Sequence, residues 1–408
     1  MSSIHRSKSN DKCLFGQIIG LIPHTILSKC IDKKASDASC RSYTTESQLI
    51  AMLFGQLNGC YSLRDITLGM NVNTLFLKEL GLKQSPARST MSDGNAQRGY
   101  EVYELLFSEL IGYYKGCFSK SEHYKVIEEI KGRSVKLIDS TTMTVCLNLI
   151  TWAKFRTAKG GIKAHVSFDL ASQIPEVVYI TDAKTDDRKA LPYLDTSYQS
   201  ILVYDRGYLD FAFFKDRIDN NGDFVTRLKE KISYEVLEER PAISGENTKI
   251  ISDQIIRITG EKARTTGLDK CKLRRVVAYD SINEREIDLL TANLEWTAET
   301  VSLIYKSRWN IELFFKGIKQ NLNIKTFLGT SENTCKSQIY IAMIAFLLME
   351  VIRRCISKTV HGFSNFVNLI RICLMHYHSL SYIVNDIREI TVRLKQKPAP
   401  PPNLLFPI

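Results

Sequence analysis

Short β-prone runs separated by helical segments most strongly limit the fold of this chain. Five such runs occur at residues 135–138, 162–168, 176–181, 201–204 and 223–228. Three of them come in succession, and helical segments at 186–193 and 209–218 alternate with the others. This order predicts an α/β fold with a mixed β-sheet flanked by helices.

The regions on either side of these runs differ from them. Residues 1–125 carry apolar residues at helical spacing, and Ser62 is placed to cap one of the helices. Short apolar runs between Gly and charged turns predict a β-rich insertion at 230–296. A single long helix is predicted at 297–321, with Thr297 as its N-cap.

The charge balance favours a polyanionic partner. Lys and Arg total 55 against 44 for Asp and Glu, and the formal net charge is +11. With 44% hydrophobic and 24% charged residues, the composition is that of a globular protein and excludes wholesale disorder. Nucleic acid is the first partner that this charge predicts, and an anionic membrane surface is the second.

The cysteines and the apolar segments exclude other classes. No two of the ten cysteines form a C-x-x-C pair, which argues against a zinc ribbon or finger. No secretory signal is recognisable, so we expect a cytoplasmic protein with reduced thiols. The most apolar run, 339–352, contains Glu350 and is too short to span a bilayer. We expect it to be a buried helix, and we expect no membrane partner.

Two aspartates stand where strands are expected to end. Asp139 follows the run 135–138, and Asp205 follows the run 201–204 and opens the sequence Asp-Arg-Gly-Tyr. Open α/β sheets place their sites at the carboxyl ends of strands. An acid after a strand is also a common turn former or helix cap, so neither residue alone indicates a function.

A third acid belongs to a cationic stripe. Its members are separated by 3, 4, 4 and 3 residues and share one face of a helix: Tyr305, Arg308, Glu312, Lys316 and Lys319. A solvated helix face with i,i+4 ion pairs has this pattern. The excess of cations also suits a phosphate backbone, with Glu312 left for a metal. Three carboxylates suit Mg²⁺ or Mn²⁺, and two such ions can promote in-line phosphoryl transfer.

These segments together resemble the bacterial DDE transposases with a Y-R-E-K motif, which cut-and-paste insertion sequences encode. The motif is present as Tyr305, Arg308, Glu312 and Lys319, after the β-rich stretch. The resemblance covers roughly residues 45–355. It implies a ribonuclease-H-like mixed sheet flanked by helices, interrupted by a β-rich insertion and preceded by a helical N-terminal domain.

The resemblance also implies roles for individual residues. The catalytic residues, which would hold Mg²⁺ or Mn²⁺ as two ions per active site, would be Asp139, Asp205 and Glu312. The DNA-binding residues would be Tyr305, Arg308 and Lys319, and helical geometry adds Lys316. In well-studied relatives an aromatic on the last insertion strand stacks a flipped base, whereas this chain has Ile287 and Asp288 there.

The expected function is metal-dependent cleavage of DNA at transposon ends and strand transfer into target DNA. The expected partners are double-stranded DNA, as terminal inverted repeats and target, and further copies of the chain in a dimeric or higher synaptic complex at the bacterial nucleoid. Two alternatives stay open: a stand-alone metal-dependent nuclease on the same core, and a catalytically silent, transposase-derived DNA-binding protein.

Five parts are expected along the chain. They are a helical N-terminal domain that binds DNA ends (1–125), a first core part (126–229), the insertion (230–296), a second core part (297–358), and a C-terminal helical region with a Pro-rich tail (359–408). Three other polar residues are predicted to be structural. His165 is expected to be a satisfied buried histidine, and Asp186 and Asp187 are expected to cap a helix.

Overall fold

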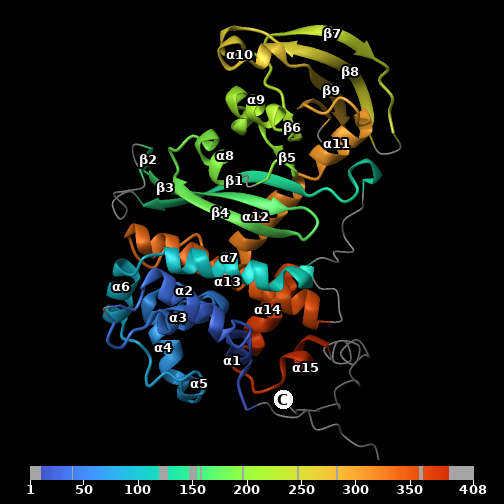
Figure 1. The fold of residues 1–408 in the computed structure, drawn as a ribbon. Coiled ribbons are helices and arrows are strands. Elements are labelled where there is room, and N and C mark those ends of the chain that lie inside the picture. The colour runs from blue at the N-terminus through green and yellow to red at the C-terminus, as the bar shows by residue number, and fades with distance from the viewer. Residues whose placement is uncertain are drawn as a thin grey trace, which may run out of the picture. The chain divides into compact units, whose positions relative to one another are not determined.

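A computed structural model describes residues 11–38, 40–118, 127–146, 154–156, 159–194, 197–245, 248–281, 284–357 and 362–385. The chain forms two compact units. One comprises Met1–Cys117 and Gln320–Ile408, and the other comprises Phe118–Lys319 (Figure 1). The boundary expected near residue 125 and the Pro-rich tail both lie outside the described residues.

The first unit is built of helices. They are α1 (Leu14–Ile19), α2 (His24–Lys34), α3 (Thr45–Asn58), α4 (Leu63–Val72), α5 (Thr74–Glu79), α6 (Arg88–Gln97), α7 (Glu101–Phe118), α13 (Glu332–Val351), the π-helical turn η5 (Ile352–Ile356), α14 (Phe363–Cys373) and α15 (Leu380–Asn385). Ser62 caps α4 as predicted, because its hydroxyl accepts a hydrogen bond from the Asp65 backbone N–H at 3.1 Å.

Helix α13 forms the centre of this unit. It is buried along nearly its whole length and contacts α3 and α6, so the run at 339–352 is the buried helix that was predicted. Glu350 is 2% exposed and pairs with Arg353 and Arg354. The segment expected as the second core part, 297–358, is thus divided between the two units. No helix in the described ranges is long and apolar enough to cross a membrane.

The second unit contains a mixed β-sheet. Its described strands are β1 (Val135–Cys146), β2 (Lys154–Arg156), β3 (Lys159–Asp169), β4 (Ile174–Asp182), β5 (Ile201–Tyr204), β6 (Phe224–Arg227), β7 (Tyr234–Arg240), β8 (Lys249–Ile258), β9 (Leu273–Asp280) and β10 (Arg285–Thr291). The order is β2-β3-β1-β5-β6-β10-β9-β8-β7, with β4 paired to β3. β1, β5 and β6 are parallel neighbours, and the other pairs are antiparallel.

The β-rich stretch predicted at 230–296 continues this sheet. Strand β10 pairs with β6, in the register Leu289↔Arg227 and Thr291↔Val225. Strands β9, β8 and β7 then follow outward as antiparallel neighbours. The insertion is therefore hydrogen-bonded to the core rather than folded as a separate sheet.

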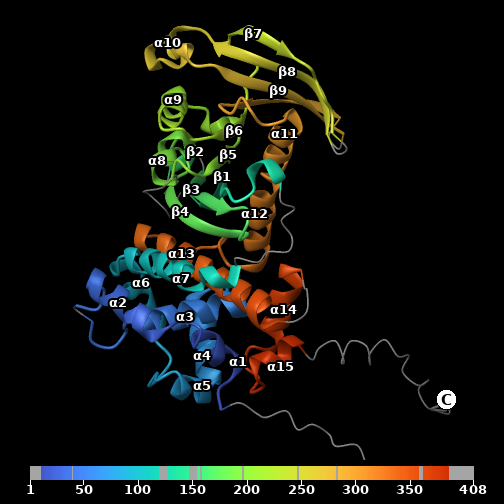
Figure 2. The same cartoon turned by 45° about the vertical axis from the view of Figure 1, so that its right-hand side comes forward.

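Helices cover both faces of the sheet. The helical segments are η1 (Glu128–Ile130), η2 (Asp187–Ala190), α8 (Leu191–Leu194), η3 (Arg206–Tyr208), α9 (Phe211–Asp219), α10 (Glu261–Thr266), η4 (Leu268–Lys270), α11 (Ala298–Lys306) and α12 (Trp309–Asn321). Residues of η2, α8, α9 and α10 share one apolar core with Ile138, Tyr204 and Phe224. Helix α11 contacts β5, β6, β8, β9 and β10 (Figure 2), and Phe314 of α12 lies 5.2 Å from Phe168 of β3, centroid to centroid. This architecture agrees with the predicted ribonuclease-H-like α/β class.

Two predicted elements have different bounds in the structure. β1 continues through the β-branched residues after Asp139 and pairs with β3 over its whole length, so Asp139 lies within a strand rather than after one. The helix predicted at 297–321 is two helices. Ser307 ends α11, and its hydroxyl donates to the Ile304 carbonyl at 2.6 Å, in competition with the helical ladder. Thr297 caps α11 as predicted.

Candidate active site

The first two candidate acids are neighbours on one face of the sheet. Ile138 of β1 pairs with Tyr204 of β5 in the parallel register, so Asp139 and Asp205 follow at the same level. Ile138 and Tyr204 belong to the core beneath η2, α8 and α9. Because side chains alternate along a strand, the two aspartates face the opposite side, where α11 and α12 lie. The site is thus at the end of the parallel pairing rather than at the end of β1.

Arg308 brings two of the acids together. Its Nη1 donates to Asp139 Oδ2 at 3.1 Å, and its Nη2 donates to Glu312 Oε1. The Tyr305 hydroxyl donates to Asp205 Oδ1 at 3.4 Å, and the Arg308 guanidinium lies 5.7 Å from the centre of the Tyr305 ring. The three acids predicted from sequence, which come from β1, the turn after β5 and α12, therefore surround one arginine and one tyrosine.

The three carboxyl groups of Asp139, Asp205 and Glu312 outnumber the one guanidinium among them, so this set of residues has an excess of negative charge. Burial raises the pKa of Asp139 to about 6, and the nearby Asp205 and Glu312 add to the rise, while the Ser140 N–H and Arg308 oppose it. Burial alone would lower the pKa of Arg308, but Tyr305, Asp139 and Glu312 raise it above its ordinary value. Burial also raises the pKa of Tyr305 to about 12. The Arg308 guanidinium thus pairs with two carboxyl groups, while the third, Asp205, meets the Tyr305 hydroxyl. The Arg308 Nε is buried and has no hydrogen-bond partner among the described residues.

The acids carry the right donor atoms for a metal, but they are held by Arg308. Among the described residues, no three His, Cys, Asp or Glu side chains lie close enough together to bind one ion. Asp139 and Glu312 are instead ion-paired to Arg308. Carboxylate oxygens are the ligands that Mg²⁺ and Mn²⁺ prefer, so the donor set fits a hard divalent cation.

The other predicted residues occupy different environments. Tyr305 is only 7% exposed and faces the acids. Lys316 is exposed on α12. Lys319 donates from Nζ to the Thr142 carbonyl of β1 at 3.2 Å. The i,i+4 ion pair of a solvated helix face does exist between Arg308 and Glu312, but Arg308 also reaches across to the sheet.

A cavity of about 690 Å³ adjoins the acids, and sequence reasoning missed most of its lining. Besides Tyr305, Arg308 and Glu312, its lining includes Asp280, which pairs with Arg285, and three cations and two further aromatic rings: Arg285, Arg227, Lys306, Tyr279 and Trp309. Lys306 and Trp309 adjoin Tyr305 and Arg308 in the sequence, and Trp309 and Trp296 are both candidates there for stacking a flipped base. Only the order of the strands brings Arg227, Arg285 and Tyr279 to them, so no local signal could have found these three. Ile287 lines the same cavity. Trp309 is 59% exposed, whereas Trp296 is 7% exposed and stacks against Arg133.

Of the three residues predicted to be structural, two have the predicted role and one does not. His165 is fully buried, and its Nε2 lies 3.0 Å from Thr181 Oγ1, which confirms a satisfied histidine. Asp186 caps η2 by accepting the Arg188 backbone N–H at 3.0 Å, as predicted. The cap predicted for Asp187 is wrong, because its carboxylate lies against Lys163 and Ser140 of the sheet.

Comparison with known proteins agrees with this architecture. Residues 130–348 match the model of the transposase DDE domain, and residues 10–83 match a domain of unknown function, DUF4372. The chain is 28% identical over 302 residues to the "Putative transposase y4zB" of Sinorhizobium fredii, covering 73% of this chain and 80% of that protein. It is 28% identical over 239 residues to the "Probable transposase for insertion sequence element IS5377" of Geobacillus stearothermophilus, covering 59% and 62% respectively.

The match to the DDE domain begins just before β1 and ends within α13. It includes all three candidate acids and the sheet that carries two of them. Since it covers more than half of the chain, the chain belongs to the DDE transposases of bacterial insertion sequences.

Proposed function

We propose that this transposase cleaves DNA at the ends of its element and joins the freed ends to target DNA, with a divalent metal as cofactor. The observation that carries the proposal is that Asp139 and Glu312 both bind Arg308, while Asp205 is hydrogen-bonded to the neighbouring Tyr305. Three elements far apart in sequence supply these acids. Their local excess of negative charge favours the binding of a cation.

Each residue of the group has a role in this proposal. Asp139, Asp205 and Glu312 would hold Mg²⁺ or Mn²⁺, as two ions per site. Such ions supply Lewis acidity and lower the pKa of a bound water or hydroxyl group. Arg308 would bind a DNA phosphate, because a guanidinium can donate two parallel hydrogen bonds to it. Tyr305 would keep Asp205 in place through its hydroxyl.

The cavity beside the acids supports binding of a DNA end. Arg227, Arg285 and Lys306 contribute positive charge to its wall, which suits the phosphates on either side of a cleaved bond. The exposed ring of Trp309 offers a surface on which a base can stack. We propose that this ring takes the role that the relatives' insertion-strand aromatic has, since Ile287 cannot stack.

The proposal extends to the partners. Double-stranded DNA would be bound as terminal inverted repeats and as target, and the helical region 1–125 would contribute to recognition of the repeats. Two ends must be paired before they are joined, so at least two copies of the chain would assemble in a synaptic complex at the nucleoid. A native gel that resolves one-end from two-end complexes tests this part, and a stand-alone nuclease would give only one-end complexes.

The central test uses the full chain and a DNA fragment that carries one element end. Asp139→Asn, Asp205→Asn and Glu312→Gln are each expected to slow cleavage in Mg²⁺ by roughly 10³-fold or more, because several kcal/mol of charge stabilisation is lost. End binding should stay within about threefold of the unaltered protein, since the phosphate contacts remain.

Asp219→Asn is the matched control. Asp219 is an exposed acid on α9 that pairs with Lys215, and its replacement should leave cleavage unchanged. Cleavage at the normal rate by a folded Glu312→Gln protein would remove Glu312 from the site. Cleavage of unrelated DNA at the same rate as element ends would favour the nuclease alternative.

A further inference from the structure

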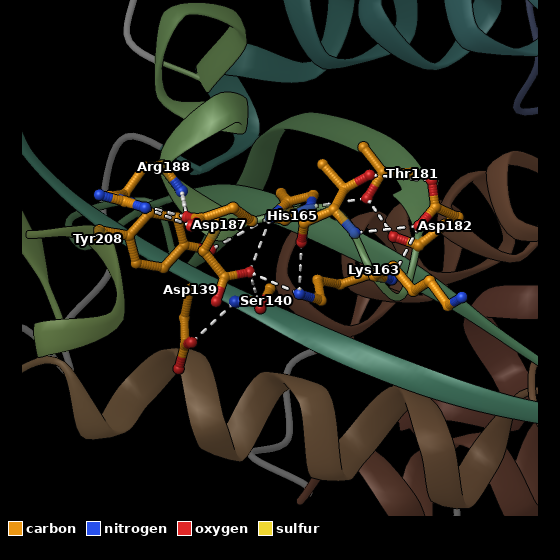
Figure 3. Close-up of polar contacts among 12 residues, drawn as sticks. Asp139, Ser140, Lys163, His165, Thr181, Asp182, Asp187, Arg188 and Tyr208 are labelled. Atoms are coloured by element: carbon orange, nitrogen blue, oxygen red, sulfur yellow. Dashed lines mark hydrogen bonds and ion pairs between the residues drawn. The ribbon is translucent and has the colours of Figure 1, made fainter. Parts of the chain in front are cut away.

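A second polar cluster lies on the other face of the sheet, behind the candidate acids. Its centre is Asp187, the first residue of η2, whose Oδ1 accepts from Lys163 Nζ at 3.0 Å and from Ser140 Oγ at 3.2 Å. His165 Nδ1 lies 3.6 Å from the same oxygen. In Figure 3 the Asp139 side chain points away from this cluster, across β1.

The register of the strands explains this arrangement. Ser140 of β1 pairs with His165 of β3, and Asp139 pairs with the apolar Val166. Side chains alternate between the faces of a strand, so Ser140, His165 and Lys163 share one face while Asp139 occupies the other. The segment between β4 and β5 brings Asp187 to the first of these faces.

The cluster touches both strand segments that carry candidate acids. On β1, Ser140 donates its backbone N–H to Asp139 Oδ1 at 2.7 Å and its hydroxyl to Asp187. After β5, the backbone N–H of Tyr208 donates to the Asp205 carbonyl at 3.0 Å, and the Tyr208 hydroxyl lies 3.4 Å from His165 Nδ1. Asp187 is therefore one contact away from Asp139 and close to the turn that holds Asp205.

That turn fits closely against the carboxylate. A Cβ atom added to Gly207 would lie 3.4 Å from Asp187 Oδ2, which is van der Waals contact, so the turn packs against the carboxylate. The Tyr208 ring is 1% exposed and cannot move without disturbing the core. The carboxylate thus limits the position of the turn from one side, and the buried ring limits it from the other.

The cluster is balanced in charge by Lys163 and not by His165. Burial lowers the pKa of His165 to about 4 in spite of Asp187, so the imidazole is neutral near pH 7. Lys163 is 13% exposed and is also held by the Thr185 carbonyl at 3.0 Å. An amide at position 187 would leave this lysine without its counter-charge while preserving the size of the side chain.

We propose that Asp187, paired with Lys163, is a positioning residue for the metal site. It holds Ser140 and the turn after β5 from behind the sheet, so that Asp139 and Asp205 converge on the opposite face. This inference rests on the proposed function, because it assumes that the two aspartates hold the metal. Groups that orient ligands in this way typically contribute 10–100-fold to metal affinity.

The test is Mn²⁺ binding by the full-length protein, measured by the electron paramagnetic resonance signal of free Mn²⁺. Asp187→Asn is expected to raise the dissociation constant by about 10–100-fold. In cleavage assays, the Mn²⁺ concentration that gives half the maximal rate should rise by a similar factor, while the rate at saturating Mn²⁺ falls much less. A purely structural role would change stability and leave this concentration unchanged.

Asp186→Asn is the matched control. Asp186 is the adjacent carboxylate, it is 41% exposed, and it pairs with Arg188 rather than with the sheet. Its replacement should leave Mn²⁺ binding unchanged. Ser140→Ala serves as the second test variant, because it removes one hydroxyl and keeps the Lys163–Asp187 pair. It is expected to weaken Mn²⁺ binding by about three- to tenfold, a fraction of the range typical for ligand-orienting groups.

Asp139→Asn distinguishes a failure of the positioning role of Asp187 from a failure of the proposed metal site. If it weakens Mn²⁺ binding while Asp187→Asn and Ser140→Ala do not, the positioning role is wrong and the proposed metal site stands. If Asp139→Asn also binds Mn²⁺ normally, the metal site is elsewhere and both proposals fail. Should Asp187→Asn not fold, Ser140→Ala alone decides, and normal Mn²⁺ binding by it overturns the inference.

Discussion

Two arginines in the second unit, the buried Arg274 and the half-buried Arg308, have opposite surroundings. Arg274 meets one acid, Asp253, through Nε and Nη2 at 2.8 and 2.6 Å, and its Nη1 donates to the Trp296 carbonyl. Both side chains of this pair are 4% exposed. The cation and the anion balance each other, and the guanidinium is bound on every side.

Arg308 stands among more acids than it can balance. It binds Asp139 and Glu312, Asp205 lies near through Tyr305, and its own Nε has no partner among the described residues. Burial, with a smaller contribution from Asp205 and Glu312, raises the pKa of Asp139. A balanced buried pair fixes architecture, whereas an unbalanced group retains charge for a ligand. The candidate site therefore differs from the structural ion pair in two respects: its charges are not balanced, and its side chains are more exposed, at 17% for Arg308 and 21% for Asp139.

The largest expected effect comes from breaking the balanced pair. Arg274→Met should lower the free energy of unfolding by about 3–5 kcal/mol, because Asp253 is left buried without a counter-charge. Urea titration followed by circular dichroism measures the loss. The double variant Asp253→Leu/Arg274→Met should lose less, since no uncompensated charge remains. A single variant as stable as the unaltered protein would contradict the structural role of this pair.

The polar cluster around Asp187, on the face of the sheet opposite Asp139, contains the buried His165. The pKa of His165 is about 4 in the folded protein against an ordinary value of 6.5, so between these values the unfolded chain binds a proton that the folded chain does not. The free energy of unfolding therefore falls as pH falls through this window, by about 3 kcal/mol from this group.

Comparison with His165→Gln isolates the histidine from the other titrating groups. The difference in unfolding free energy between the two proteins should change by this amount between pH 7 and pH 4, as measured by urea titration at each pH. A constant difference would mean that the pKa of His165 is the same in the folded and the unfolded chain, so that burial does not lower it.

A smaller effect is expected at the unbalanced site. Arg308→Met should lower the free energy of unfolding in the presence of a chelator by about 1–2 kcal/mol, because these partly exposed acids lose their cation. Mg²⁺ should reduce the difference in unfolding free energy between Arg308→Met and the unaltered protein, since a bound cation replaces the lost charge. Mg²⁺ should not change the difference in unfolding free energy between Arg274→Met and the unaltered protein. If Mg²⁺ leaves the difference in unfolding free energy between Arg308→Met and the unaltered protein unchanged, the acids of Arg308→Met do not bind the ion.

The smallest change in stability is expected at Lys319, whose ammonium donates to the Thr142 carbonyl. Lys319→Ala should cost about 0–1 kcal/mol of stability. If Lys319 contacts a phosphate, the slope of log K against log salt for end binding should flatten by about 1. Binding titrations at several salt concentrations measure this slope, and Lys215→Ala on α9 serves as the control. Equal affinities and equal salt slopes for Lys319→Ala and the unaltered protein would mean that Lys319 does not contact DNA.

Local patterns predicted most strands of the core and placed the candidate acids beside them. The β-prone runs correspond to β1, which contains Asp139, and to β5, which Asp205 follows, and helical spacing placed Arg308 one turn from Glu312. What local patterns could not supply were pairings between distant segments. The partner β3, which extends β1, the joining of β10 to β6, and the meeting of Asp187 with Lys163 all depend on register across the sheet. The break at Ser307 was missed because its hydroxyl competes with the helix ladder, an outcome that apolar periodicity does not record.

The joining of β10 to β6 also has a consequence for synthesis. Proteins of this kind emerge from the ribosome N-terminus first and begin to fold as they emerge. Strands β1, β5 and β6 can pair early, which brings Asp139 and Asp205 together, but β6 lacks its outer neighbour until β10 has been made. Glu312 follows later still, on α12. A chain released prematurely after β5 but before α12 therefore carries only two of the three candidate acids, and under the proposed function such a fragment lacks a complete metal site.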